Sequence, residues 1–326
     1  MSSRFSSEQL KAEACRLGFF ACGIAKASPV SKEVACHYRQ WIANGGHADM
    51  HYLENNIDKR LDPTLLVEGA RSIIVVAMNY APARRIPQEE YQLAVYAYGK
   101  DYHDVLKQRL QKLASHFSPI VPPLGEVRRG PLSPLTSNKI ATDTVPILER
   151  YWAQQAGLGF IGRHHQLIIP QAGSMFFLGE IITTAEFDHY DEPMTNRCGT
   201  CQRCIDACPT GALQRTKDNE HLSLFNSRKC LSYQTIENRG ELDDDIKDKL
   251  GNTIYGCDRC QQACPWNRFA TPTEIAELQP SEELLNMKRE KWEKLSVEDY
   301  RKLFKGSAVK RAKYDGLIRN IKAVKE

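Results

Sequence analysis

The stretch that decides the fold is CGTCQRCIDACPTGAL, residues 198–213, together with its partial repeat CDRCQQACPWN, residues 257–267. The first contains four cysteines spaced C-x2-C-x2-C-x3-C-P, which is the ligand spacing of bacterial iron–sulfur modules. The second has the same spacing but only three cysteines. Two [4Fe-4S] clusters need eight thiolates, so one more cysteine must come from elsewhere.

The missing ligand is Cys230, the one other cysteine in this region. In two-cluster modules the fourth cysteine of each run binds the other cluster. This rule assigns one cluster to Cys198, Cys201, Cys204 and Cys264, and the second to Cys208, Cys230, Cys257 and Cys260. Zinc is the alternative metal, because C-x2-C pairs also form tetrahedral zinc sites. The two C-x3-C-P endings favour iron and sulfur.

The composition is that of a globular protein, with 42% hydrophobic and 26% charged residues in a chain of 326. No apolar run reaches the length of about 18 residues that a membrane helix needs, and the N-terminus lacks the order of a signal peptide. We therefore expect a cytoplasmic protein without membrane association. The three remaining cysteines, Cys15, Cys22 and Cys36, are predicted to be buried free thiols.

The charge is unevenly distributed. Residues 286–326 contain 13 Lys and Arg against 6 Asp and Glu, so this end carries +7 while the whole chain carries +4. A basic end on a slightly acidic body is suited to binding a polyanion locally. The alternative is an ordinary solvated helix face.

Apolar periodicity, caps and turn residues predict alternating helices and strands. Helices are expected over 7–17, 31–44, 101–117 and 146–156, and again in the stretches 281–295 and 296–304. Strands are expected over 19–27, 72–80, 91–99, 164–170 and 174–184. A Pro-rich loop is expected over 120–135. These elements suggest a body over 1–190, a cysteine-rich domain over 191–270 and a basic helical segment over 271–326.

Other motifs limit the chemistry. The chain has neither G-x-G-x-x-G nor G-x-x-x-x-G-K-[ST], so nicotinamide and nucleotide sites have little support. Asp101 and His103 begin an Asp-x-His-x-x-Gly-like signature for cobalamin, but Leu106 replaces the glycine, so His103 is interpreted as a residue near a helix N-terminus rather than a metal ligand. His164 and His165 are adjacent, so strand alternation would point them apart. Asp143 either caps the helix that opens at Pro146 or, if burial raises its pKa, donates a proton.

Several stretches together resemble the epoxyqueuosine reductases. They cover the chain from near its start to about residue 320 and include ENNIDKRLDPTLLVEGARSIIVVAMNY, YAYGKDYHDVL, TDTVPILERYWAQQAGLGFIGRHHQLI, AGSMFFLGEI, both cysteine runs and FKGSAVKRAKYDGLIRN. The combination of D-T-x-P-x-L-E-R with two cluster motifs is specific. Longer members carry C-terminal helical repeats, which this chain lacks.

The resemblance implies an α/β (α+β) nitroreductase-like domain that binds cobalamin, joined to a ferredoxin-like domain with two [4Fe-4S] clusters and a short helical end. It implies an oxidoreductase that reduces epoxyqueuosine to queuosine at the wobble position of tRNA. Electrons would pass through the clusters to cobalamin. The implied partners are tRNA and an external one-electron reductant of the flavodoxin or ferredoxin type, and the protein is expected to be a monomer.

The resemblance also assigns residues to roles. Asp143 corresponds to the proton donor. The implied cobalamin contacts are Arg60, Tyr98, Asp143, Ser174, Ser232 and Tyr233. The implied tRNA contacts are Arg150, Lys310, Arg311 and Arg319. Two other functions are consistent with the cysteine motifs: a reductive dehalogenase, which shares cobalamin and two clusters, and a ferredoxin-type electron-transfer protein without a substrate of its own.

Overall fold

The computed structural model describes residues 5–117, 136–215 and 224–325, so the predicted Pro-rich loop lies outside the described residues. A four-stranded antiparallel sheet occupies the centre of the large body, in the order β1-β2-β7-β4. Its strands are β1 (Ala21–Lys26), β2 (Ser72–Asn79), β4 (Asn138–Ala141) and β7 (Phe176–Thr183). Because β7 is central, it brings β2 and β4 together although they are far apart in the sequence.

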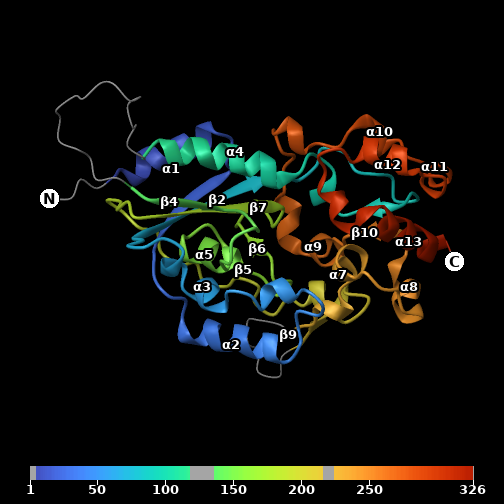
Figure 1. The fold of residues 1–326 in the computed structure, drawn as a ribbon, viewed down its shortest axis with the longest axis horizontal. Coiled ribbons are helices and arrows are strands. Elements are labelled where there is room, and N and C mark those ends of the chain that lie inside the picture. The colour runs from blue at the N-terminus through green and yellow to red at the C-terminus, as the bar shows by residue number, and fades with distance from the viewer. Residues whose placement is uncertain (1–4, 118–135, 216–223, 326) are drawn as a thin grey trace.

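Helices cover both faces of this sheet (Figure 1). The face with Ile74, Val76 and Ile181 packs against α1 (Ser7–Arg16) and α4 (Tyr102–Ser115). The opposite face packs against α5 (Glu149–Gln155), and α2 (Lys32–Ala43) and α3 (Ile57–Leu61) lie on the same side. Each strand therefore alternates between two apolar layers, which explains why both faces are hydrophobic.

The cysteine-rich region is built from short elements. The bounds are α6 (Arg203–Asp206), β8 (Leu213–Gln214), β9 (Leu224–Phe225), α7 (Leu231–Ile236), α8 (Asp244–Leu250), β10 (Thr253–Tyr255) and α9 (Arg259–Gln262). Strand β10 pairs in parallel with β3 (Gln92–Leu93), which belongs to the large body. The cysteine-rich region is thus joined to the body by a backbone ladder.

The C-terminal end is helical, as predicted, with α10 (Glu282–Leu285), α11 (Arg289–Glu293), α12 (Val297–Leu303) and α13 (Lys313–Lys325). The single-turn helices are η1 (His51–Leu53), η2 (Pro63–Leu65), η3 (Val95–Ala97), η4 (Ser227–Lys229), η5 (Pro265–Phe269), η6 (Ala276–Leu278) and η7 (Ala308–Ala312). One apolar core extends from Leu10 through β10 to Ile321. The three predicted segments therefore share a core.

Most long elements were predicted correctly. The helices expected over 7–17, 31–44 and 101–117 form, and Ser6, Ser31 and Asp101 cap their N-termini. The strands expected over 19–27, 72–80 and 174–184 also form. In these segments the pattern of apolar residues in the sequence agrees with the packing in the fold, and each of the three helices also has a polar residue at its N-cap.

Four predictions were wrong. The strand expected over 164–170 is limited to β6 (Leu167–Ile168), which pairs with β5 (Phe160–Ile161). The strand expected over 91–99 is limited to Gln92–Leu93, because the chain then turns into η3. The helix expected from Pro146 begins at Glu149, and no side chain caps it. Cys15 and Cys36 are exposed rather than buried. None of the helices in the described part of the chain is both long and apolar enough to cross a membrane.

Candidate active site

Asp143 lies in a loop at the edge of the sheet, directly after β4. Its φ of 52° is in the left-handed region, which aspartate tolerates better than most residues. Its backbone N–H donates a hydrogen bond to Glu149 Oε1 at 2.6 Å, so the first residue of α5 holds the loop in place. The Asp143 side chain is 48% exposed and free to meet another molecule. Asp143 is therefore not the helix cap that its sequence context suggested.

Two side chains at the start of α4 point toward the Asp143 carboxylate. The Tyr102 hydroxyl donates a hydrogen bond to Oδ2, and His103 Nε2 lies 3.6 Å from the same oxygen. On its other side, His103 Nδ1 is 2.7 Å from Asp101 Oδ1. Asp101, His103 and Asp143 thus form a continuous chain of groups that can exchange protons.

Burial and neighbouring carboxylates keep Tyr102 and His103 protonated. Burial raises the pKa of Tyr102 far above its ordinary value, and the charge of Asp143 raises it further. The hydrogen bond to Asp101 raises the pKa of His103, and the charges of Asp101 and Asp143 add to this effect. Both groups can therefore donate hydrogen bonds to Asp143 at neutral pH.

Two further carboxyl groups lie next to Asp143. Burial, followed by the charge of Asp143, raises the pKa values of Glu149 and Glu180 well above the ordinary range. Glu180 is fully buried in β7, and neither of its oxygens has a hydrogen-bond partner. The site therefore contains three carboxyl groups, of which the two deeper ones are held as neutral acids.

Two arginines on the α5 and α3 side of the fold have distinct environments. Arg150 is exposed to solvent, yet surrounding protein lowers its pKa. Its Nη1 donates to the carbonyl of His165 at 2.6 Å. Arg60 lies with its guanidinium 6.0 Å from the Tyr38 ring, and its buried Nε has no partner. Arg60 is therefore a cationic group with an unsatisfied donor.

The other residues assigned to cobalamin are mostly engaged within the protein. Tyr98 is buried, and its hydroxyl accepts a hydrogen bond from the Ile86 N–H at 3.3 Å. Buried Tyr233 donates its hydroxyl hydrogen to Asp49. Ser232, at the start of α7, is partly exposed. Among these three, Ser232 is the one whose side chain remains accessible.

Ser174 likewise makes contacts inside the protein. Its N–H donates to Asn267 Oδ1 at 2.7 Å, and its carbonyl accepts from Gln261 Nε2 at 2.8 Å. Both partners belong to the second cysteine run. Ser174 therefore joins the beginning of β7 to the cysteine-rich region.

The basic residues of the C-terminal segment have different environments. Lys310 is exposed in η7. The pKa of Asp101 is lowered chiefly by its hydrogen bond with His103 and less by the charge of Lys310, which places Lys310 near the site. Arg311 binds both oxygens of Glu237, at 2.8 and 2.9 Å, and lies 5.7 Å from the exposed ring of Tyr52.

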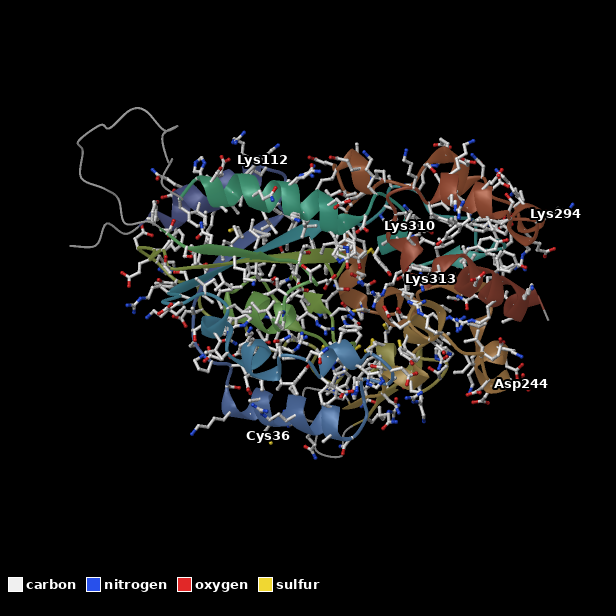
Figure 2. The ribbon with its side chains drawn as sticks, in the orientation of Figure 1. Cys36, Lys112, Asp244, Lys294, Lys310 and Lys313 are labelled. Carbon is white, nitrogen blue, oxygen red and sulfur yellow. The ribbon has the colours of Figure 1, made fainter. Side chains whose placement is uncertain are left out.

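Arg319 differs from these two residues. Its guanidinium donates to the carbonyls of Gln234, Asn238 and Gly240, and burial lowers its pKa. These bonds fix the turn after α7 and leave Arg319 a structural role. In Figure 2, Lys310 and Lys313 lie well inside the outline of the molecule, whereas Lys294 lies at its outer edge. The positive charge of this segment is thus spread over more than one surface.

The cysteines come together in the two groups that their spacing predicts. Cys198, Cys201, Cys204 and Cys264 line one small cavity. In the second group, burial raises the pKa of the Cys260 thiol, and neighbouring Cys257 and Cys230 raise it further. Cys208 acts on Cys230 in the same way, although there burial is again the main cause. Each group brings four free thiols together, which is the donor set of a cubane cluster.

Another group of potential metal ligands lies in the loop after α2. His47 Nε2 and His51 Nδ1 are each 2.7 Å from Glu54 Oε1, and all three ligand atoms lie within 4.8 Å of one another. Hydrogen bonding to one carboxylate oxygen explains this arrangement. It needs no metal ion.

Sequence reasoning did not identify Tyr102, Glu149 or Glu180 as parts of the site. Glu180 left a signal, because a carboxylate inside the apolar strand FFLGEIIT is unusual. His164 was placed at the start of a strand, but it lines the first cysteine cavity together with Arg163, which sequence reasoning did not single out. Only the fold places them there.

The fold and the site define an iron–sulfur oxidoreductase, since a cysteine-rich module is packed against a sheet that carries a group of titratable side chains around Asp143. The family models described as "4Fe-4S double cluster binding domain" and "Epoxyqueuosine reductase QueG, DUF1730" match residues 197–267 and 60–128. Epoxyqueuosine reductase from Cellulophaga algicola is 40% identical, covering 98% of both chains. The one from Synechocystis is 39% identical, covering 92% of this chain and 99% of that one. The chain belongs to the epoxyqueuosine reductase family.

Solved structures agree with this assignment. A crystal structure of an epoxyqueuosine reductase with an epoxyqueuosine-modified tRNA-Tyr stem loop superposes with a TM-score of 0.81 at 27% identity, covering 97% of this chain and 80% of that one. The Bacillus subtilis enzyme, with an aspartate catalytic loop swung out of its active site, gives a TM-score of 0.80 at 26% identity and the same coverage.

Proposed function

We propose that this protein reduces epoxyqueuosine to queuosine in the anticodon of tRNA, using electrons supplied by two [4Fe-4S] clusters. The observation that carries the proposal is the position of Asp143. This carboxylate lies in a loop of left-handed backbone at a sheet edge, is about half exposed, accepts a hydrogen bond from the Tyr102 hydroxyl and lies 3.6 Å from His103 Nε2. A related enzyme has an aspartate on its catalytic loop, which supports Asp143 as the equivalent group.

The chemistry requires such a group. When a C–O bond of the epoxide breaks, the oxygen gains negative charge, and a nearby acid must protonate it. Asp143 is placed to give that proton, while Tyr102 and His103 orient its carboxyl group. Loss of water in the second half of the reaction needs a proton again, so the donor must be protonated a second time.

We further propose that cobalamin binds beside Asp143, within a nitroreductase-like body. The unsatisfied Nε of Arg60 and the accessible hydroxyl of Ser232 suit the amide and phosphate groups of a corrin cofactor. When bound, cobalamin supplies a cobalt centre that transfers electrons to the substrate. Tyr98, Ser174 and Tyr233 would support the walls of this site, since their side chains are already engaged.

For tRNA, the groups nearest the site are Arg150, Lys310 and Arg311. A modified base within an anticodon loop must leave its stack to reach an enzyme's acid, and cations then hold the surrounding phosphates. Tyr52 is an exposed aromatic ring beside Arg311 and can stack on a base. An external flavodoxin or ferredoxin would supply electrons to a monomeric, cytoplasmic protein.

The test is an anaerobic assay of the reconstituted protein with cobalamin and tRNA that contains epoxyqueuosine. Nucleosides are then measured by mass spectrometry. Queuosine should appear with cobalamin and not in its absence. No queuosine under either condition would reject the proposed function, and formation without cobalamin would reject the cofactor alone.

A further inference from the structure

The carboxyl group of Glu180 lies beneath the loop that carries Asp143. Glu180 is on β7 directly opposite Ala141, the last residue of β4, so the chain enters the loop beside it. Its side chain shares the sheet face of Val75 and Ala141, which α5 covers. The residue is fully buried, and both of its oxygens are without a hydrogen-bond partner.

Such a group is costly to keep in a protein core. A buried carboxylate without partners costs several kcal/mol, so the neutral acid is the form that is present. The raised pKa of Glu180, caused by burial and then by the charge of Asp143, agrees with this form. An apolar side chain at this position would pack at lower cost. A buried polar group without partners therefore points to a role beyond stability.

Glu149 connects this buried acid to Asp143. Its Oε1 accepts the Asp143 N–H at 2.6 Å, and its carboxyl lies close enough to the Asp143 side chain for their hydrogen bond to influence its pKa. The charge of Glu180 also raises the pKa of Glu149. The other titratable groups that face the cluster are Arg150 on α5 and Tyr102 and His103 on α4.

The proposed reaction needs two protons, and the following step rests on that proposed function. Converting an epoxide to an alkene consumes two electrons and two protons. The oxygen takes the first proton when one C–O bond opens, and it leaves as water with the second when the other C–O bond breaks. The electrons come from the cluster module, but a single carboxyl group carries only one proton.

We propose that Glu149 and Glu180 form a proton reserve that reprotonates Asp143 between the two steps. Glu149 passes its proton to Asp143 by direct contact. Glu180 is a positioning residue, because neither of its oxygens has a hydrogen-bond partner and it acts by keeping Glu149 protonated. Solvent refills the reserve after product release.

The test compares the pH profiles of kcat and KM for the native protein and for the Glu180→Gln variant, which keeps the size and neutrality of the acid. In the alkaline range one of the two acids becomes ionised, and its charge keeps the proton on the other. Glutamine stays neutral at every pH, so the pKa of Glu149 should fall in the variant and the alkaline limb of kcat should move to lower pH. We expect a loss of about tenfold in kcat at pH 8, about threefold at pH 6 and an unchanged KM, below the 10²–10⁴-fold range of a direct acid. Glu180→Asp should restore the limb in part.

Thr183→Val is the matched control, since Thr183 is fully buried on the same strand and also polar. It should leave the profile unchanged. If Glu180→Gln does not fold, Glu149→Gln should show the same shift, because Glu149 is at the surface end of the pair. Profiles of both variants that superpose on the native one would reject the proton reserve while queuosine formation continued. No queuosine from the native protein would reject the proposed function itself.

Discussion

Replacing Asp143 with asparagine removes the transferable proton and little else. Asparagine tolerates the left-handed conformation at φ 52°, so the loop should keep its shape. The backbone N–H can still donate to Glu149, and the new amide oxygen can still accept from Tyr102. The variant should therefore fold and bind both cofactor and tRNA.

The expected loss of turnover follows from the neighbouring groups. Tyr102 cannot replace the acid, because its raised pKa makes it a weak donor. His103 Nε2 lies 3.6 Å from Asp143 Oδ2, and Nδ1 of the same ring is 2.7 Å from Asp101 Oδ1, so the ring is held between two carboxylates. With no substitute, kcat should fall about 10³-fold, within the range for general acids and equal to about 4 kcal/mol in activation free energy.

The assay is a single-turnover reaction under anaerobic conditions, with queuosine measured by mass spectrometry and KM determined separately. Asp104→Asn is the control, because it removes the same charge from the exposed side of the first turn of α4. That variant should keep native turnover. An Asp143→Asn variant with turnover within about threefold of native, far less than a lost general acid costs, would show that another group donates the proton.

Three other results are expected. Cys230→Ser should halve the iron content, from about eight to about four atoms per chain, as measured by iron analysis after anaerobic reconstitution. Replacing Lys310 and Arg311 with alanine should weaken tRNA binding. The slope of the logarithm of the binding constant against the logarithm of the salt concentration should become shallower by about 0.7 per lost phosphate contact, as measured by titration at several salt concentrations. Asp101→Asn should lower the pKa of His103, as followed by NMR. The pKa of His103 is raised in the folded protein, so protonated His103 stabilises the fold. This contribution to the free energy of unfolding is complete below the pKa of the unfolded chain, about 6.5, and is lost as the pH rises through the folded pKa. The variant should lose most of that pH dependence.

The cysteine sites could be read from the sequence because their ligands are local. Seven of the eight cysteines occur within two short runs, and two clusters require one more from outside, which identifies Cys230. The structure brings both predicted groups together. The spacing is informative because a cluster requires its cysteine ligands at fixed short intervals, whatever the fold of the rest of the chain.

The group around Asp143 could not be predicted in this way, because its residues are far apart in the sequence and are brought together by strand pairing in the sheet. Asp143 looked like a helix cap, but Glu149 begins the helix six residues later and holds the loop by accepting its N–H. Glu180 is brought beneath the loop by the pairing of β4 with β7, two strands that are far apart in the sequence. No local period encodes that register.

The contact between the cysteine-rich region and the sheet explains how electrons can reach the site reproducibly. Gln261 donates to the Tyr80 hydroxyl at 2.9 Å and to the Ser174 carbonyl, and Asn267 accepts the Ser174 N–H. Gly173 has φ 88°, and a Cβ there would collide with Asn267, so the backbone must approach closely at this point. Gln261 lies between Cys260 and Cys264, which the sequence assigns to different clusters. A shift of either cluster relative to β7 would therefore break several buried hydrogen bonds at once, which fixes the distance from the clusters to the sheet edge that carries Asp143.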